Sequence, residues 1–370
     1  MMKESAISLD PHSIITAASE QTGGLTDTGE QFFTEGLNKA CESLEQESEL
    51  NATGRYMARD RLIGHTVNRL RYLEDRKLNP AIAKEKIEKP VFIIGLPRTG
   101  TTILHDILAQ DLSSRVPLTW ECMFPSPPPE RKTYLTDPRI EKCQATFPDT
   151  FELMPEFKMM HPMGADLSQE CIVMWGESMC TPLFHGQWFM PSYQDWVDQA
   201  NFAPVYDFHK KQLQHLQWRC PNDRWVLKSG GHMWGLEHLL ATYPDARIIF
   251  THRDPVKSMT SFASLCSTVY SIGSDEVDAL KITDDWTARN ARAVDHALDV
   301  RGKSISPDAK IYDMFFSDFV SDQFAEIERI YAALDIEMSG EAADRMRAYI
   351  DSHPKGVHGN HTYKADDFGI

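Results

Sequence analysis

Residues 89–107 read Lys-Pro-Val-Phe-Ile-Ile-Gly-Leu-Pro-Arg-Thr-Gly-Thr-Thr-Ile-Leu-His-Asp-Ile, the most informative segment of the sequence. The β-branched and aromatic run at 91–94 is typical of a strand that is buried on both faces. A turn bracketed by Gly95 and Gly100 follows, and apolar residues from 103 onward recur at helical spacing. The stretch therefore predicts a strand, a loop and a helix, a geometry whose backbone N–H groups can hold a phosphate.

The loop has the glycine spacing of a P-loop, but the lysine that should follow the second glycine is absent. Instead a cation, Arg98, stands two residues before that glycine. A nucleoside triphosphatase needs the lysine to reach its β- and γ-phosphates and a Ser/Thr to hold Mg²⁺. The displaced cation favours a shorter donor that needs no metal.

Two later segments repeat the pattern of strand, turn and helix. Residues 224–228 predict a strand that ends in a lysine, and residues 246–252 predict another strand. Arg253 follows this last strand, and Ser261 lies eight residues further on in a predicted helix. Arginine offers a bidentate fork for phosphate, and the serine adds a hydroxyl on the same face. Alternating strands and helices predict a parallel sheet with a ligand at the carboxyl ends of its strands.

Together these motifs resemble those of sulfotransferases that use 3′-phosphoadenosine 5′-phosphosulfate (PAPS). The similarity is greatest to the bacterial and tyrosylprotein-sulfotransferase-like branch, which has arginine in its 5′-phosphosulfate loop. The resemblance covers roughly residues 90 to 365. It implies an α/β fold, with a P-loop-like parallel sheet flanked by helices. It also implies transfer of a sulfonyl group from PAPS to a hydroxyl or amine of a small-molecule acceptor, with PAP as product and no metal.

The resemblance assigns roles to individual residues. Arg98 and Lys228 would neutralise charge on the bridging and equatorial oxygens as the bond breaks. Glu121 and His232 are the two candidates for the base that takes the acceptor's proton. Glu121 could equally pair with Arg115, and His232 could equally cap a helix or lie on the surface. The residues expected to bind the donor are Arg98, Thr99, Gly100, Thr101, Thr102, Arg253, Ser261, Lys355 and Gly356.

Two positions depart from the family pattern. Pro354 stands where the family usually has an arginine in the loop that closes over the 3′-phosphate. Ile103 stands where the cytosolic enzymes have a tryptophan that stacks on adenine. Adenine must therefore find another surface.

The rest of the chain divides at the loop. Residues 1–88 predict an N-terminal arm and helical extension, with a loose arm as far as about residue 25 and then two or three amphipathic helices. Residues 89–370 predict the sulfotransferase-like α/β domain, to which 120–223 contribute acceptor-pocket segments. Helices are further expected within 193–218, at 232–242, 275–300 and 319–334, and a fourth strand at 310–316.

The segment 120–223 is rich in aromatic and methionine residues, which suit either an adaptable pocket or a core. Glu170 and His161 or His185 are candidate polar groups of such a pocket.

Composition excludes several classes of function. The chain of 370 residues has a formal net charge of −16, which opposes nonspecific binding of nucleic acid or an anionic membrane. No apolar run approaches the roughly 20 residues that span a bilayer, so no integral membrane contact is expected. Seven irregularly spaced cysteines and the lack of a visible signal peptide predict reduced thiols and a cytoplasmic location. The N-terminal helices leave a homodimer contact open.

Two other functions stay open on the sequence. A variant P-loop nucleotide kinase or NTPase predicts turnover that depends on Mg²⁺ and an aspartate at a neighbouring strand end, where residues 251–253 offer no acid. A noncatalytic protein that binds adenosine bisphosphate would hold the nucleotide and transfer nothing.

Overall fold

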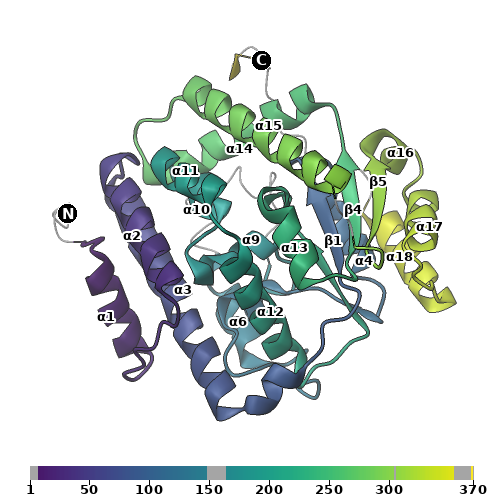
Figure 1. Ribbon diagram of the computed structural model, residues 1–370, viewed down its shortest axis with the longest axis horizontal. Helices are drawn as coiled ribbons and strands as arrows, with labels where there is room; N and C mark the ends of the chain where they lie inside the picture. Colours follow the sequence, from purple (N-terminus) through teal and green to yellow (C-terminus); the bar gives the residue numbers. More distant parts are fainter. Residues whose placement is uncertain (1–6, 148–163, 304–305, 354–367, 370) are drawn as a thin grey trace.

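A computed structural model, which describes residues 7–147, 164–303, 306–353 and 368–369, has a parallel sheet at its centre (Figure 1). The sheet has five strands in the order β2-β3-β1-β4-β5, and each pairing between neighbours is parallel. The predicted fold class is therefore confirmed. In chain order the strands are β1 (Val91–Gly95), β2 (Ser114–Arg115), β3 (Arg224–Lys228), β4 (Arg247–His252) and β5 (Lys310–Phe315). The short edge strand β2 was not predicted.

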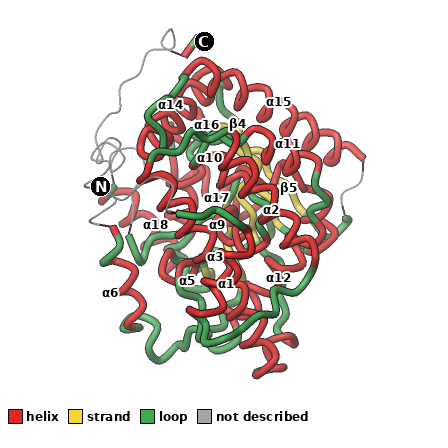
Figure 2. Tube along the Cα trace, turned by 90° about the vertical axis from the view of Figure 1, so that its left-hand side faces the viewer, coloured by secondary structure: helices red, strands yellow, loops and turns green. Residues whose placement is uncertain are grey.

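Both faces of the sheet are covered, as the sequence of β1 requires. Successive side chains of a strand point to opposite faces. Accordingly, Phe92 and Ile94 belong to one hydrophobic cluster, and Val91 and Ile93 belong to a second. Figure 2 shows the strands in yellow with helices around them. A continuous apolar run can therefore be a central strand only because helices pack on both sides.

The larger cluster joins the sheet to most of the helices. These are α1 (Pro11–Gln21), α2 (Gln31–Gln46), α3 (Ala52–Leu78), α9 (Cys171–Met174), α10 (Pro182–Gln187), α11 (Pro191–Gln199), α12 (Ala203–Gln217), α13 (Leu236–Thr242) and α15 (Ala279–Lys303). The opposite face carries α4 (Thr101–Leu108), α16 (Phe316–Ser321), α17 (Gln323–Ala333) and α18 (Gly340–Ser352). The other helices are α5 (Thr119–Met123), α6 (Pro138–Gln144), α14 (Pro255–Gly273) and the 3₁₀ turns η2 (Pro80–Lys84), η3 (Trp175–Ser178) and η4 (Gly230–Gly235).

The N-terminal prediction was partly wrong. The segment before residue 25 is not a loose arm, because it contains α1, and Ile14 and Ala18 on this helix are buried. Asp10 caps α1 by accepting a hydrogen bond from the Ser13 N–H, a strong start signal that the sparse apolar spacing concealed. The amphipathic helices predicted after it are α2 and α3.

Several predicted helices are interrupted. The helix expected at 232–242 begins as the 3₁₀ turn η4 and continues as α13. The one expected at 275–300 is α15, and α14 before it ends at Gly273. The region 319–334 is divided between α16 and α17, with Asp322 capping α17. The segment 193–218 contains α11 and α12.

Two glycine contacts fix the N-terminal helices to the rest of the molecule. A Cβ at Gly54 on α3 would lie 2.1 Å from the carbonyl oxygen of Gly273, the last residue of α14. A Cβ at Gly36 on α2 would lie 2.3 Å from the carbonyl oxygen of Met179. In addition, the Asn51 N–H donates to the same Gly273 carbonyl at 2.9 Å. The boundary at residue 88 therefore separates segments that share one core.

The thiols are unpaired, and the described helices are not of the membrane-spanning kind. All seven cysteines are buried and none forms a disulfide, as their irregular spacing predicted. Within the described ranges, no helix combines the length and apolar character needed to cross a bilayer.

Candidate active site

The loop between β1 and α4 follows an unusual backbone path. Gly95 has φ +137°, and a Cβ there would lie 2.4 Å from the Thr251 hydroxyl oxygen. Gly100 has φ +86°, and Arg98 adopts φ +64° although it carries a side chain. Positive φ is uncommon for a residue with a Cβ and costs conformational energy. The path turns the loop over the start of α4, where the first N–H groups have no partner within the helix.

Thr99 links this loop to the neighbouring strand β4. Its side chain is fully buried, and its hydroxyl donates to the Leu96 carbonyl at 2.7 Å. The same hydroxyl lies 2.7 Å from the Thr251 hydroxyl on β4. The loop is thus held against the neighbouring strand β4.

The two motifs that the sequence predicts for the donor meet at this loop. Arg98 donates from Nε to the Ser261 hydroxyl on α14 at 3.1 Å. Arg253 donates from Nη1 to the Arg98 carbonyl at 2.5 Å, although the two residues are 155 positions apart. The Ser258 hydroxyl donates to the Pro97 carbonyl. The carboxyl ends of β1 and β4 therefore bring both cationic segments to one place.

Lys228 lies on the other side of the loop. Strand pairing puts it opposite Ile93 of β1, and only 2% of the residue is exposed. Its ammonium group donates to the Thr102 hydroxyl at 3.2 Å and to Glu170 Oε1 at 2.6 Å. Glu170 precedes α9, in the segment where the sequence offered it only as a polar group of an acceptor pocket. No recognisable motif surrounds it that could have indicated this contact.

Glu121 has a different position from the one expected of a base. It is fully buried and forms an ion pair with Arg115. Its second oxygen, Oε2, accepts from the Leu118 N–H at 3.1 Å and from the Tyr134 hydroxyl at 3.0 Å. This geometry argues against a role in proton transfer and favours the alternative, a carboxylate that pairs with Arg115 and caps α5.

His232 is also withdrawn from the loop. The residue is fully buried, and its Nδ1 lies 2.8 Å from the Tyr206 hydroxyl. Its ring meets those of Phe92 and Trp175 edge to face, with centroids 5.0 and 4.9 Å away. Burial lowers the pKa of His232 well below its ordinary value. A neutral ring buried among aromatic side chains is poorly placed to take a proton from an acceptor, and His232 is neither a helix cap nor a surface residue.

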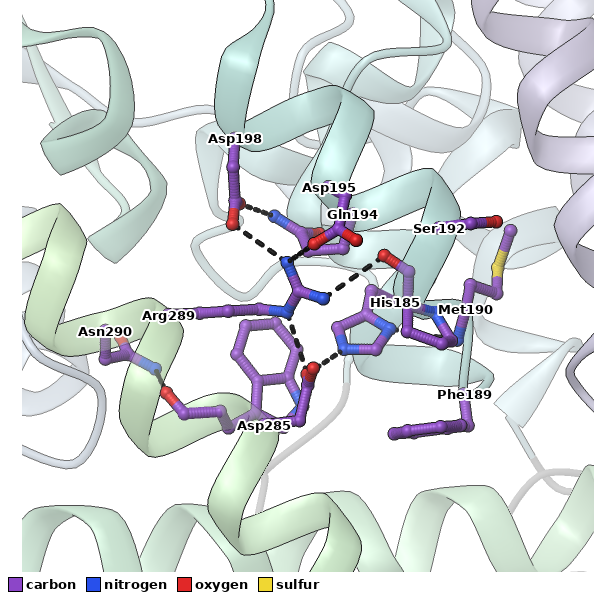
Figure 3. A network of polar contacts seen from close by, with 12 residues as sticks. His185, Phe189, Met190, Ser192, Gln194, Asp195, Asp198, Asp285, Arg289 and Asn290 are labelled. Atoms are coloured by element: carbon purple, nitrogen blue, oxygen red, sulfur yellow. Dashed lines mark hydrogen bonds and ion pairs between the residues drawn. The ribbon is translucent and has the colours of Figure 1, made fainter.

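His185 belongs to a separate polar network, which joins α10, α11 and α15 (Figure 3). Its Nε2 lies 2.7 Å from Asp285, and its Nδ1 accepts from the Met190 N–H at 2.9 Å. Arg289 on α15 bonds to Asp285 and Asp198, each at 2.8 Å. Burial raises the pKa of the Asp285 carboxyl, but bonds from His185 and Arg289 outweigh it and lower this pKa to about 2.

This His185 network fixes helix packing. His161, Lys355 and Gly356 lie outside the described residues.

An aromatic ring that the sequence did not predict adjoins the loop. The guanidinium carbon of Arg253 lies 4.3 Å from the centroid of the Phe316 ring. A Cβ at Gly100 would lie 3.0 Å from the same ring. Phe316 is the first residue of α16, directly after β5, so the parallel order of the sheet brings it beside the loop.

The site combines three cations with the positive end of a helix in a chain whose net charge is −16. Arg98, Arg253 and Lys228 all adjoin the start of α4. Such an arrangement is suited to an extended anion with negative charge at more than one position. Among the described residues, no three His, Cys, Asp or Glu side chains are grouped to bind a metal ion.

Comparisons with known proteins agree with this arrangement. The sequence profile of the Sulfotransferase family matches residues 90–340. The omega-hydroxy-beta-dihydromenaquinone-9 sulfotransferase Stf3 of Mycobacterium bovis and of Mycobacterium tuberculosis is 25% identical in an alignment of 278 residues that covers 72% of this chain and 68% of Stf3.

Two crystal structures are similar over almost the whole chain. Sulfotransferase STF1 from Mycobacterium tuberculosis H37Rv is 28% identical, with a TM-score of 0.86 over 97% of this chain and 95% of STF1. Sulfotransferase STF9 from Mycobacterium avium is 26% identical, with a TM-score of 0.87 over 97% of this chain and 92% of STF9. The similarity therefore includes the N-terminal helices.

Proposed function

The chain belongs to the sulfotransferase family and is an enzyme, and we propose that it transfers a sulfonyl group from PAPS to a hydroxyl or amine of a small molecule. The observation that carries the proposal is the meeting of two distant motifs. Arg98 bonds to Ser261, and Arg253 bonds to the backbone of Arg98. A donor with phosphate groups on the 3′ and 5′ positions of one ribose needs cations at two adjacent positions, and these contacts supply them.

In this proposal, different residues bind the 5′-phosphate, the 3′-phosphate and the adenine of the donor. Backbone N–H groups of 99–102 would hold the 5′-phosphate at the start of α4. Arg253 and Ser261 would hold the 3′-phosphate with a guanidinium fork and a hydroxyl. The Phe316 ring beside Arg253 is the surface that we assign to adenine, which solves the problem of the missing tryptophan at Ile103.

PAPS supplies an activated sulfonyl group, so the protein has to stabilise the negative charge that gathers on the phosphate as the bond breaks. Lys228 is suited to this role because an ammonium group has three N–H donors. Two of these donors bond to Thr102 and Glu170. The third would face the oxygen that leaves with the nucleotide, and Arg98 would add a second positive charge.

The acceptor that we propose has an apolar body. Four partly exposed apolar side chains adjoin the loop and the turn η4, namely Leu96, Ile172, Trp234 and Phe262. The relative Stf3 is named for a hydroxylated menaquinone acceptor. Such side chains can bind an apolar molecule and bring its hydroxyl to the polar end of the site at Lys228.

Calorimetry with adenosine 3′,5′-bisphosphate tests the donor site, and radiolabelled PAPS with EDTA present tests the reaction. The acceptors are phenols, sterols, glycolipids and amines. We expect binding of the nucleotide and transfer of label to acceptors with a large apolar part. Absence of heat with the nucleotide contradicts the proposal. Binding without transfer favours a noncatalytic protein, and turnover of ATP that EDTA abolishes favours a kinase or NTPase.

Arg253→Ala is expected to raise the KM for PAPS about tenfold to a hundredfold, because it removes charge-assisted hydrogen bonds to phosphate. The kcat should stay near that of the wild type, since Arg253 would contact the end of the donor remote from the sulfur. Initial rates at varied PAPS concentration measure both constants.

The matched control is Arg347→Ala. Arg347 also lies over an aromatic ring, with its guanidinium carbon 3.9 Å from the centroid of Phe324, but it is on α18. This variant should keep the wild-type KM. Equal effects of the two substitutions would argue against the 3′-phosphate assignment.

A further inference from the structure

We propose that His105 is a positioning residue that acts through Lys228, an inference that rests on the proposed function. His105 lies on α4, three residues after Thr102, and is fully buried. Its Nε2 lies 3.0 Å from the backbone carbonyl oxygen of Val226 on β3. Because a carbonyl oxygen can only accept, Nε2 carries the proton and donates. This bond joins the helix that begins at the donor loop to the strand that carries Lys228.

The first support is the reason why this bond forms. Backbone groups of successive strand residues point to opposite edges, and the Ser229 N–H donates to the Ile93 carbonyl of β1. The Val226 carbonyl, three residues earlier, therefore points toward β2. Continued past its last pair, the register of β2 and β3 puts the backbone nitrogen of residue 117 next to this carbonyl. That residue is Pro117, which has no N–H, so His105 supplies the missing donor.

The second support is that the bond closes a ring of contacts around the reacting end of the donor site. Lys228 and Val226 are two residues apart on β3, so their side chains point to the same face of the sheet. His105 and Thr102 are three residues apart and lie on one side of α4. The Lys228 ammonium donates to the Thr102 hydroxyl at 3.2 Å. The two hydrogen bonds together fix the distance between the end of β3 and the start of α4.

The third support is that the ring of His105 is neutral. Burial, and next the positive charge of Lys228, lower the pKa of His105 to about 3. The ring therefore adds no charge that would repel the Lys228 ammonium group. Among the described residues, His105 Nδ1 has no hydrogen-bond partner. Replacing His105 thus removes one polar contact, the bond to Val226, and no charge.

The effect on catalysis follows from the nature of lysine. Its ammonium group ends a flexible stem of four carbons, so the groups around it determine where it lies. In the proposed reaction, the Lys228 ammonium has to face the oxygen that leaves with PAP. A displacement of about 1 Å at a reacting centre can lower a rate by about a hundredfold. The bond from His105 holds the backbone two residues before Lys228 at a constant distance from the donor loop.

His105→Met is expected to lower kcat about tenfold, with the KM for PAPS and the affinity for adenosine 3′,5′-bisphosphate within about twofold of the wild type. Methionine fills a similar volume and has no N–H to donate. His105→Gln should keep most of the rate, because its amide N–H can reach the Val226 carbonyl. Initial rates measure kcat and KM. The stoichiometry from calorimetry gives the fraction of chains that bind nucleotide, and kcat is expressed per binding chain.

The matched control is His215→Met. His215 on α12 is also fully buried, and its Nε2 lies 3.0 Å from the Pro125 carbonyl oxygen. The same chemical change at this position should lower the stability of the fold and leave kcat per binding chain unchanged. An equal loss of kcat in the two variants would overturn the inference, because it would show a general effect of a buried carbonyl that has lost its donor.

A double variant tests whether His105 acts through Lys228. Substitutions that affect the same interaction do not have additive effects. In the Lys228→Met background, which lacks the ammonium group, adding His105→Met should lower the remaining kcat by less than about twofold. A further tenfold loss in the double variant would overturn the inference.

The outcomes separate this inference from the proposed function. A wild-type chain that does not turn over PAPS overturns the proposed function, and this inference with it. A wild type that turns over PAPS, together with full kcat in His105→Met, overturns this inference alone. A higher KM for PAPS with unchanged kcat also overturns it. A loss of kcat in His105→Met that is absent from His105→Gln and from the Lys228→Met background supports it.

Discussion

Lys228→Met is expected to lower kcat for sulfonyl transfer about a thousandfold, the loss typical of removing a preorganised charge from a reacting centre. Methionine has a similar length and fills the buried space, since Lys228 is 2% exposed. The variant loses the ammonium group that joins Thr102 and Glu170. Initial rates with radiolabelled PAPS measure kcat, and calorimetry with adenosine 3′,5′-bisphosphate measures donor binding.

The expected pattern is a large change in kcat with a small change in nucleotide affinity, the reverse of that for Arg253→Ala. Lys77→Met is the control, because Lys77 forms an exposed ion pair with Asp27 on α3. It should leave kcat unchanged. Full activity in the Lys228→Met variant would contradict the mechanism proposed for this site.

Glu121→Gln is expected to lower the free energy of unfolding by about 3–5 kcal/mol while leaving kcat of the folded enzyme near the wild-type value. The substitution leaves the Arg115 guanidinium buried without its counter-charge. The remaining partners of Arg115, the carbonyls of Leu216 and Cys220 at 2.5 and 2.6 Å, are neutral. Urea unfolding followed by circular dichroism measures the change in stability.

Glu130→Gln provides the comparison, since Glu130 pairs with Arg219 where both side chains are about half exposed. Removing an exposed pair should change the free energy of unfolding by less than about 1 kcal/mol. If Glu121→Gln instead keeps full stability and loses activity, Glu121 is the base and the interpretation of its ion pair as structural is wrong.

The central part of the fold could be predicted because its signals are local. Four short segments rich in β-branched and aromatic residues identified β1, β3, β4 and β5. Parallel strands end at one edge of the sheet, so the meeting of Arg98 with Arg253 and Ser261 followed from topology. Predicting that these residues meet required no knowledge of side-chain packing.

The partners of the buried and half-buried carboxylates could not be predicted in this way. Glu121 and Arg115 are six residues apart, and their pairing depends on how the chain turns between β2 and α5. Glu170 reaches Lys228 from a segment 58 positions away that contains no regular pattern. Contacts of this kind are decided by the packing of irregular segments, for which spacing along the chain carries no information.

The contact between Gly54 and Gly273 has a practical consequence. α14 carries Ser258 and Ser261 near its first turn, and its last residue contacts α3. This single helix of 19 residues therefore extends from the proposed anion site to the N-terminal helices. The family match begins at residue 90, so an expression plan based on the match alone would start the protein there. A protein shortened in this way would expose the apolar surface that α1–α3 cover. It would also leave the C-terminal end of α14 without its contact with α3. Expression of this protein for assay therefore has to begin upstream of α1.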